Sequence, residues 1–295
     1  MARICLIFGP PPNHRGMEIK EFSWTNDNGN RIYAVDWSVA EARAVVGLVH
    51  GIGEHCRRYD HLAAFFAEHG IATVGYDRQG FGRSEGRRAF ARDYREYVDE
   101  IARLRVQCET RYPDRPAFLY GHSMGGQLLL RYLIRRNPDV RGAIVSAPHI
   151  RLAYRPNPLL VAVGKFFRNL YPTLTRPNDL DVNGISRDPA VVAAYQSDPL
   201  NHNLVTSQLG MDMLDNAATL NDYADGLPVP VLLMHGDADR LTAHAASQAF
   251  ARRNPRNLTF KSWPGLYHEL HNEPEQGEVM EYVLEWMETR LGAGG

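Results

Sequence analysis

The sequence predicts an α/β protein in which a mostly parallel sheet is flanked by helices and interrupted by a helical insertion. Apolar runs that suit buried strands alternate with helical patterns over residues 44–146. The alternation resumes over residues 230–291, and helical patterns separated by prolines occupy the stretch between the two blocks. This alternation of strands and helices predicts a parallel, doubly wound sheet, and its connections are expected to be right-handed.

The first block begins with a hairpin. Residues 18–25 and 31–37 are rich in strand-forming residues and flank the turn sequence Asn-Asp-Asn-Gly-Asn. A continuous apolar strand at 44–49 and a helical pattern at 59–69, stopped by Gly70, follow. The remaining elements are, in order, a strand at 71–76, a helix at 93–111, strands at 116–120 and 141–146, and between these two a helix at 127–133.

The second block follows a long interruption. Residues 149–226 contain no convincing strand pattern, and we interpret them as a helical cap between two core strands, placed to cover the strand ends. The core is then residues 17–148 and 227–295, and residues 1–16 are a loose leader or tail without the marks of a signal peptide. The later elements are strands at 230–235 and 257–263 and helices at 243–253 and 275–291.

Composition narrows the functional classes. The net charge of −1 gives no reason to expect a nucleic-acid partner. No apolar stretch approaches the roughly 20 residues of a spanning helix. The three cysteines form neither a disulfide framework nor a CxxC site, which favours a reducing compartment. We therefore expect a cytoplasmic protein, with peripheral association with membranes left open.

Residues 121–126 read Gly-His-Ser-Met-Gly-Gly and lie between a predicted strand and a predicted helix. A Gly-x-Ser-x-Gly sequence in that position is the nucleophile elbow of an α/β-hydrolase fold. The serine occupies a sharp, strained turn, and glycines two residues to either side avoid a clash there. Ser123 is thus the predicted nucleophile; the alternative is a glycine-rich loop without a catalytic role.

A serine hydroxyl needs a base, and the base needs an orienting acid. In an α/β-hydrolase these follow the serine in the order acid, then histidine. Asp237 and Asp239 follow the strand after the insertion, and His268 and His271 follow the last strand. We favour Asp239 as the acid, because Asp237 is close enough to the strand end to form a turn or cap. We favour His268 as the base, with His271 as the alternative.

An oxyanion hole needs the backbone N–H after the nucleophile and a second N–H from the loop after an early strand. Met124 supplies the first. Residues 50–55 read His-Gly-Ile-Gly-Glu-His, and the glycines on either side of Ile52 let the backbone approach a substrate. Ile52 is therefore the expected second donor, and the alternative is a simple glycine-rich turn.

Four segments together resemble the monoacylglycerol lipase family: residues 50–55, 77–86, 121–126 and 235–240. The resemblance covers residues 18–291. It implies an α/β-hydrolase fold without a cofactor, acting on a small lipid ester. It also implies Ser123, Asp239 and His268 as nucleophile, acid and base, and Ile52 and Met124 as the oxyanion donors.

By the same resemblance, Glu54, Arg58 and His271 line a polar pocket for the glycerol part, and Tyr195 reaches it from the insertion. A carboxylate, a guanidinium and an imidazole can all bind hydroxyl groups. The alternative for Glu54 and Arg58 is a surface ion pair that opens the next helix.

Residues 159–171 form a broad apolar helical face. Three interpretations stay open: a wall of the tunnel for the acyl chain, ordinary packing of the cap on the core, or transient contact with a lipid surface.

The sequence thus predicts a serine hydrolase that cleaves monoacylglycerols through an acyl-enzyme. The alternatives are a lysophospholipase, a general carboxylesterase or acyltransferase, and an inactive hydrolase fold that serves as a binding module. No metal is expected, because the histidines and aspartates of residues 235–271 fit no standard ligand spacing. Cys56 lacks an elbow of its own, and residues 77–80 are predicted to form a structural turn beside the site.

Overall fold

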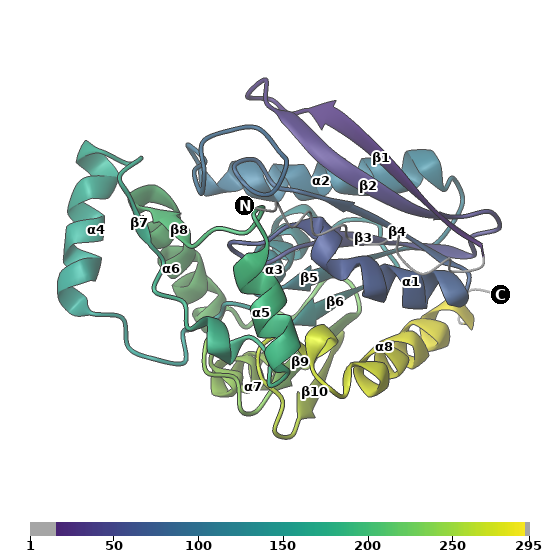
Figure 1. The fold of residues 1–295 in the computed structure, drawn as a ribbon. Helices are drawn as coiled ribbons and strands as arrows, with labels where there is room; N and C mark the ends of the chain where they lie inside the picture. Colours follow the sequence, from purple (N-terminus) through teal and green to yellow (C-terminus); the bar gives the residue numbers. More distant parts are fainter. Residues whose placement is uncertain (1–15, 293–295) are drawn as a thin grey trace, which may run out of the picture.

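The computed structural model describes residues 16–292, and an eight-stranded sheet with the order β1-β2-β4-β3-β5-β6-β9-β10 lies at its centre (Figure 1). The pairs β1–β2 and β2–β4 are antiparallel, and the other pairs are parallel. The prediction of a mostly parallel sheet is confirmed. The strands are β1 (Met17–Thr25), β2 (Arg31–Val39), β3 (Ala44–Val49), β4 (Ile71–Tyr76), β5 (Ala117–His122), β6 (Gly142–Ser146), β9 (Val231–Gly236) and β10 (Leu258–Trp263).

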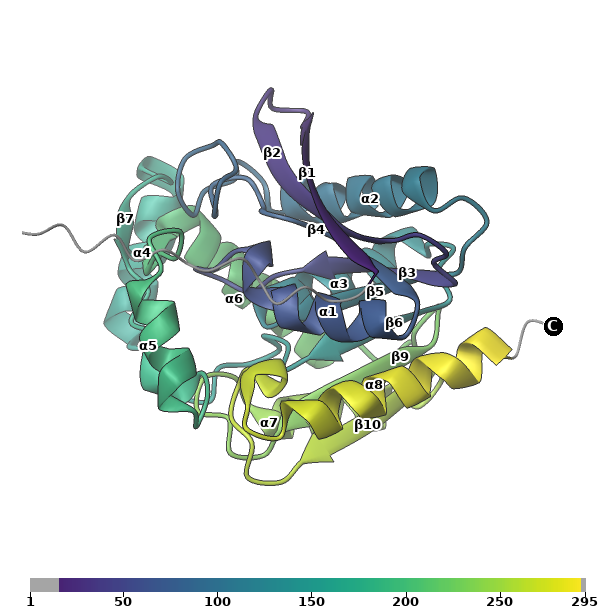
Figure 2. The same cartoon turned by 45° about the vertical axis from the view of Figure 1, so that its right-hand side comes forward.

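Helices cover both faces of this sheet. One face carries α1 (Asp60–Glu68) and α8 (Gln276–Leu291), which lie side by side in front of the strands in Figure 2. The other carries α2 (Tyr94–Arg111), α3 (Met124–Arg136) and α7 (His244–Arg253). The described residues also form short 3-10 helices: η1 (Cys56–Tyr59), η2 (Val182–Gly184) and η3 (Leu270–Asn272).

The continuous apolar runs arise because the central strands are buried on both faces. In β3, Val45 and Val49 pack into the core beneath α2 and α3. Val46 and Leu48 point the other way, into the core beneath α1 and α8. A strand between two cores needs apolar residues at consecutive positions, because its side chains alternate between the faces.

Most of the segment between β6 and β9, residues 147–230, lies beyond one end of the sheet, at the left in Figure 2. It contains α4 (Pro158–Leu170), α5 (Pro189–Ser197) and α6 (Ser207–Asp222). It also contains a small antiparallel sheet of β7 (Thr175–Pro177) and β8 (Leu204–Thr206). The expectation of no strand here was wrong, because runs of three residues are too short to give a periodic pattern.

The predicted leader, residues 1–16, lies outside the described residues except for Gly16. Within the described part of the chain, no helix has the length and apolar character needed to cross a membrane.

Candidate active site

Ser123 stands at the sharp turn between β5 and α3. Its backbone has φ 55° and ψ −118°, a strained conformation for a residue with a side chain. The flanking glycines make the turn possible by close packing. A Cβ on Gly121 would stand 2.7 Å from the carbonyl oxygen of Gly125, and one on Gly125 would collide with the backbone oxygens of Val49 and His50. The elbow is therefore pressed against the loop that follows β3.

Three buried side chains form a continuous hydrogen-bonded chain. His268 Nε2 lies 2.9 Å from Ser123 Oγ, and His268 Nδ1 lies 2.7 Å from Asp239 Oδ2. Asp239 lies in the loop after β9, and His268 lies in the loop after β10. The carboxyl ends of these parallel strands therefore bring both side chains to the elbow. This geometry lets the imidazole accept the serine proton while its other nitrogen donates to the carboxylate.

The Asp239 carboxylate is held by further donors. Oδ1 accepts hydrogen bonds from the backbone N–H groups of Leu241 at 2.7 Å and Thr242 at 3.0 Å. Oδ2 accepts from the Thr242 hydroxyl at 2.8 Å and lies 3.0 Å from His235 Nε2. His235 and Thr242 were missed from the sequence, where nothing marks them beyond their nearness to Asp239.

Electrostatics suits this arrangement. Burial opposes ionisation of Asp239, but the charge of His268 and hydrogen bonds from His235 and His268 outweigh it and hold the pKa of the carboxyl below its ordinary value. Burial also opposes the charge on His268, but the Asp239 carboxylate outweighs it and raises the pKa of that imidazole. Asp239 is thus ionised, and a carboxylate in this position stabilises positive charge on the neighbouring imidazole.

The competing residues lie elsewhere. Asp237 Oδ1 accepts a hydrogen bond from the N–H of Gly265 at 2.7 Å, a link between two loops. The His271 ring stacks on Tyr59 with 4.5 Å between ring centroids, and it is buried. Burial, together with the charge of neighbouring His122, lowers the pKa of His271 well below its usual value. Neither residue makes a hydrogen bond to Ser123 or His268.

The loop after β3 is fixed from two sides. The Arg78 guanidinium is fully buried and donates to the carbonyl oxygens of His50 and Gly51, the latter at 2.5 Å. Glu54 Oε1 accepts from the Gly51 N–H at 2.5 Å. These contacts hold the backbone before Ile52 beside the elbow. The role of Arg78 was not predicted, because residues 77–80 read only as a turn.

A cluster of charged and aromatic side chains surrounds Arg58, which we call the Arg58 cluster. Arg58 pairs with Glu54 at 2.5 Å and, through two nitrogens, with Glu269 at 2.7 Å. Its guanidinium lies 4.7 Å over the ring of Tyr195, whose hydroxyl donates to the Gly53 carbonyl at 3.2 Å. The ion pair expected as an alternative for Glu54 and Arg58 is present, but it is buried and lies beside the loop after β3.

Glu269 is the member of the Arg58 cluster that the sequence did not reveal. Burial works against its ionisation, but the charge of Arg58 prevails and lowers the pKa of the Glu269 carboxyl to about 2. The only feature of the sequence that could have marked Glu269 as a site residue is its position directly after His268. Glu54, Arg58, Tyr195 and His271 are not among the residues that line the apolar pocket described next.

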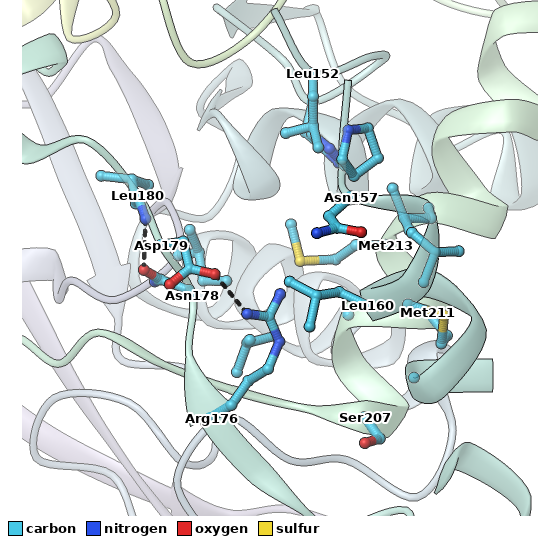
Figure 3. A pocket seen from close by; sticks show the side chains of 18 of the residues that line it. Leu152, Asn157, Leu160, Arg176, Asn178, Asp179, Leu180, Ser207, Met211 and Met213 are labelled. Carbon is cyan, nitrogen blue, oxygen red and sulfur yellow. Dashed lines mark hydrogen bonds and ion pairs between the residues drawn. The ribbon is translucent and has the colours of Figure 1, made fainter. Parts of the chain in front are cut away.

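A pocket of about 320 Å³ opens at Ser123 between the elbow and the insertion. Ile52, His149 and His268 border it near the serine. Farther out the lining is largely aliphatic, and in Figure 3 Leu152 and Leu160 lie around the same space. The aliphatic lining residues are Leu152, Leu160, Val161, Val163, Leu174, Leu180, Val205, Met211, Met213, Leu214 and Leu241.

The predicted apolar face of residues 159–171 is divided between two environments. Leu160, Val161 and Val163 line the pocket. Leu159 and Phe166 do not line it and are 70% and 62% exposed. No residue of α4 is fully buried, so ordinary core packing does not account for this face.

Within residues 16–292, no group of His, Cys, Asp and Glu side chains has the arrangement of a metal site.

Comparison with known proteins places this site in a family. The family model described as serine aminopeptidase, S33, matches residues 40–275. The chain is 37% identical over 251 residues to an uncharacterized abhydrolase domain-containing protein of Dictyostelium discoideum, covering 84% of this chain and only 26% of that protein. It is 35% identical over 274 residues to a monoacylglycerol lipase of Mycolicibacterium smegmatis, covering 92% of this chain and 98% of the relative.

A crystal structure of the Paleococcus ferrophilus monoacylglycerol lipase superposes with a TM-score of 0.77 at 28% identity, covering 93% of this chain and 99% of that one. The predicted α/β-hydrolase fold is thus confirmed. The chain belongs to the monoacylglycerol lipase family of α/β-hydrolases, within the wider S33 family.

Proposed function

We propose that the protein is a serine hydrolase that cleaves monoacylglycerols into glycerol and a fatty acid. The observation that carries this proposal is the hydrogen-bonded chain from Ser123 through His268 to Asp239, which opens onto an aliphatic pocket. A relative of nearly equal length that is named a monoacylglycerol lipase supports the choice of substrate.

The reaction follows from the geometry. Ser123 Oγ attacks the ester carbonyl as His268 Nε2 takes its proton, and Asp239 stabilises the imidazolium. The N–H groups of Ile52 and Met124 bind the oxyanion. Collapse of this intermediate breaks the bond to glycerol, which leaves with the proton from His268. Water, deprotonated by His268, then attacks the acyl-enzyme and releases the fatty acid.

The two halves of the substrate need different surroundings. The aliphatic pocket suits the acyl chain, since burying apolar surface is favourable. We propose that the glycerol meets the Arg58 cluster and His271. Because both oxygens of Glu54 are already engaged, this cluster also sets the position of the loop that carries Ile52.

A turnover panel tests the proposed function. Monoacyl-, diacyl- and triacylglycerols of several chain lengths, lysophospholipids and simple esters are compared by kcat/KM. The proposal expects the monoacylglycerols to be the best substrates. A preference for lysophospholipids would instead make the enzyme a lysophospholipase, and no turnover of any ester would favour a binding module.

Replacing Arg78 with lysine is expected to lower kcat about 10- to 100-fold while KM changes little. Lysine cannot hold the carbonyl oxygens of His50 and Gly51 in the fixed geometry that the guanidinium imposes. The Ile52 N–H group is then no longer held in position to donate to the oxyanion. Steady-state kinetics on a monoacylglycerol measures the effect. Arg83→Lys is the matched control, because Arg83 is half exposed in the same segment and pairs with Glu21. A rise in KM with unchanged kcat would contradict this role.

We further propose that the outward side of α4 contacts a lipid surface, from which substrate enters the pocket. Leu159, Phe166 and Leu170 are 70%, 62% and 67% exposed there, and Figure 1 shows α4 at the margin of the molecule. This proposal agrees with a cytoplasmic enzyme that meets membranes peripherally. The buried free thiols of Cys56 and Cys108 also suit a reducing compartment.

Phe166→Glu combined with Leu170→Glu is expected to weaken binding to phosphatidylcholine vesicles at least tenfold. The reason is that each buried Leu or Phe side chain contributes about 1.5–3 kcal/mol. Vesicle co-sedimentation measures the change. Val106→Glu is the control, because Val106 is 47% exposed on α2, outside the insertion. Equal binding by all variants would refute contact through α4.

A further inference from the structure

A histidine that the proposed mechanism does not use lies in the pocket beside the nucleophile. His149 follows β6, and its backbone N–H donates to the Ser123 carbonyl at 3.1 Å. Its side chain is buried and borders the pocket together with Ser123 and His268. The ring therefore lies where the first carbons of a bound acyl chain would pass.

Gln127 orients this histidine. Gln127 is fully buried on α3, and its side-chain nitrogen donates to the carbonyl oxygens of His149 at 2.7 Å and Met213 at 2.9 Å. Its side-chain oxygen accepts from the Tyr94 hydroxyl. Two carbonyl oxygens on one side and a hydroxyl on the other leave the amide only one orientation.

The amide in turn selects one tautomer of His149. The Gln127 nitrogen lies 3.0 Å from His149 Nδ1, and its two hydrogens point to the carbonyl oxygens of His149 and Met213. A proton on Nδ1 would face this donor nitrogen, so the tautomer without that proton is favoured. Burial, together with the charge of His268, lowers the pKa of His149 to about 4, and the ring is therefore neutral at physiological pH. Its single proton is on Nε2. Among the described residues, none accepts a hydrogen bond from that atom.

We propose that His149 determines acyl specificity, its Nε2–H group binding an oxygen carried by the acyl chain close to the ester. This inference rests on the proposed function, in which His268 serves the leaving oxygen, Ile52 and Met124 serve the carbonyl oxygen, and the Arg58 cluster binds the glycerol hydroxyls. The oxygen left for His149 is then one on the acyl chain itself, such as a hydroxyl or keto group. A plain chain leaves a buried donor unpaired, which is costly, whereas an oxygenated chain satisfies it.

The test compares two substrates that differ in one hydroxyl, 1-octanoylglycerol and 1-(3-hydroxyoctanoyl)glycerol. The measured quantity is the ratio of kcat/KM for the hydroxylated ester to that for the plain ester. His149→Phe keeps a ring of similar size but removes the donor, and it is expected to lower this ratio about two- to tenfold, the range for one neutral hydrogen bond. His149→Gln retains a donor and is expected to keep part of the ratio.

General damage to the enzyme cancels in this ratio, and His69→Phe, on an exposed histidine outside the pocket, is the matched control. An unchanged ratio in His149→Phe would overturn the inference. If His149→Phe does not fold, the inference is tested instead by measuring how strongly two fatty acids inhibit the unaltered enzyme. The inhibition constant of 3-hydroxyoctanoate should be about two- to tenfold below that of octanoate, and equal constants would overturn the inference. Turnover of neither ester by the unaltered enzyme would instead refute the proposed function.

Discussion

Replacing Ser123 with alanine is expected to lower kcat for monoacylglycerol hydrolysis by about 10⁴- to 10⁶-fold, because the attacking oxygen is removed. The fold should persist, since within residues 16–292 the Ser123 hydroxyl makes a hydrogen bond only with His268. Kinetics on a monoacylglycerol measures the loss, and a fluorophosphonate probe should label the unaltered enzyme but not the variant.

Ser197→Ala is the matched control for this experiment. Ser197 is exposed at the end of α5, and its hydroxyl bonds only to backbone oxygens of its own helix. Both kcat and probe labelling should stay at the level of the unaltered enzyme. Retention of most activity by Ser123→Ala would mean that another group performs the attack.

Much of this site could be predicted from sequence because its markers are local. The elbow needs two glycines at fixed positions around Ser123, and a short sequence records that requirement directly. Asp239 and His268 follow strands, so the carboxyl ends of a parallel sheet had to bring them close. The buried strands were equally visible, since a strand such as β3 between two cores is apolar throughout.

The residues that support the site could not be predicted, because tertiary contacts alone define their roles. Arg78 looks like a turn residue until the fold places its guanidinium under the loop of His50 and Gly51. Gln127 looks like an ordinary helical residue until Tyr94, His149 and Met213 surround it. No periodic pattern records contacts between segments this far apart in the chain.

Asp239→Asn is expected to lower kcat/KM about 10⁴-fold, because it leaves His268 in the wrong tautomer. The contacts of the carboxylate predict which way the new amide turns. Its oxygen replaces Oδ1, which accepts from the backbone N–H groups of Leu241 and Thr242, so its NH₂ group faces His268 Nδ1. The imidazole proton must then move to Nε2, which can no longer accept the proton of Ser123.

Asp237→Asn is the matched control for this loop. The Asp237 side chain is exposed and accepts one hydrogen bond from Gly265, so its loss should change kcat/KM by no more than about threefold. A large loss in Asp237→Asn with a small one in Asp239→Asn would exchange the roles of the two residues.

The pH dependence of kcat/KM in Asp239→Asn provides a second, independent test of the role of Asp239. In the unaltered enzyme, kcat/KM should fall as the pH drops through the pKa of His268, because only the neutral imidazole accepts the serine proton. Asp239 raises that pKa against the opposing effect of burial. Removing the carboxylate leaves burial to dominate, so the acid limb of kcat/KM should move to lower pH in Asp239→Asn. The double variant Ser123→Ala/Asp239→Asn sets the background rate, and an acid limb that stays in place would show that Asp239 does not control His268.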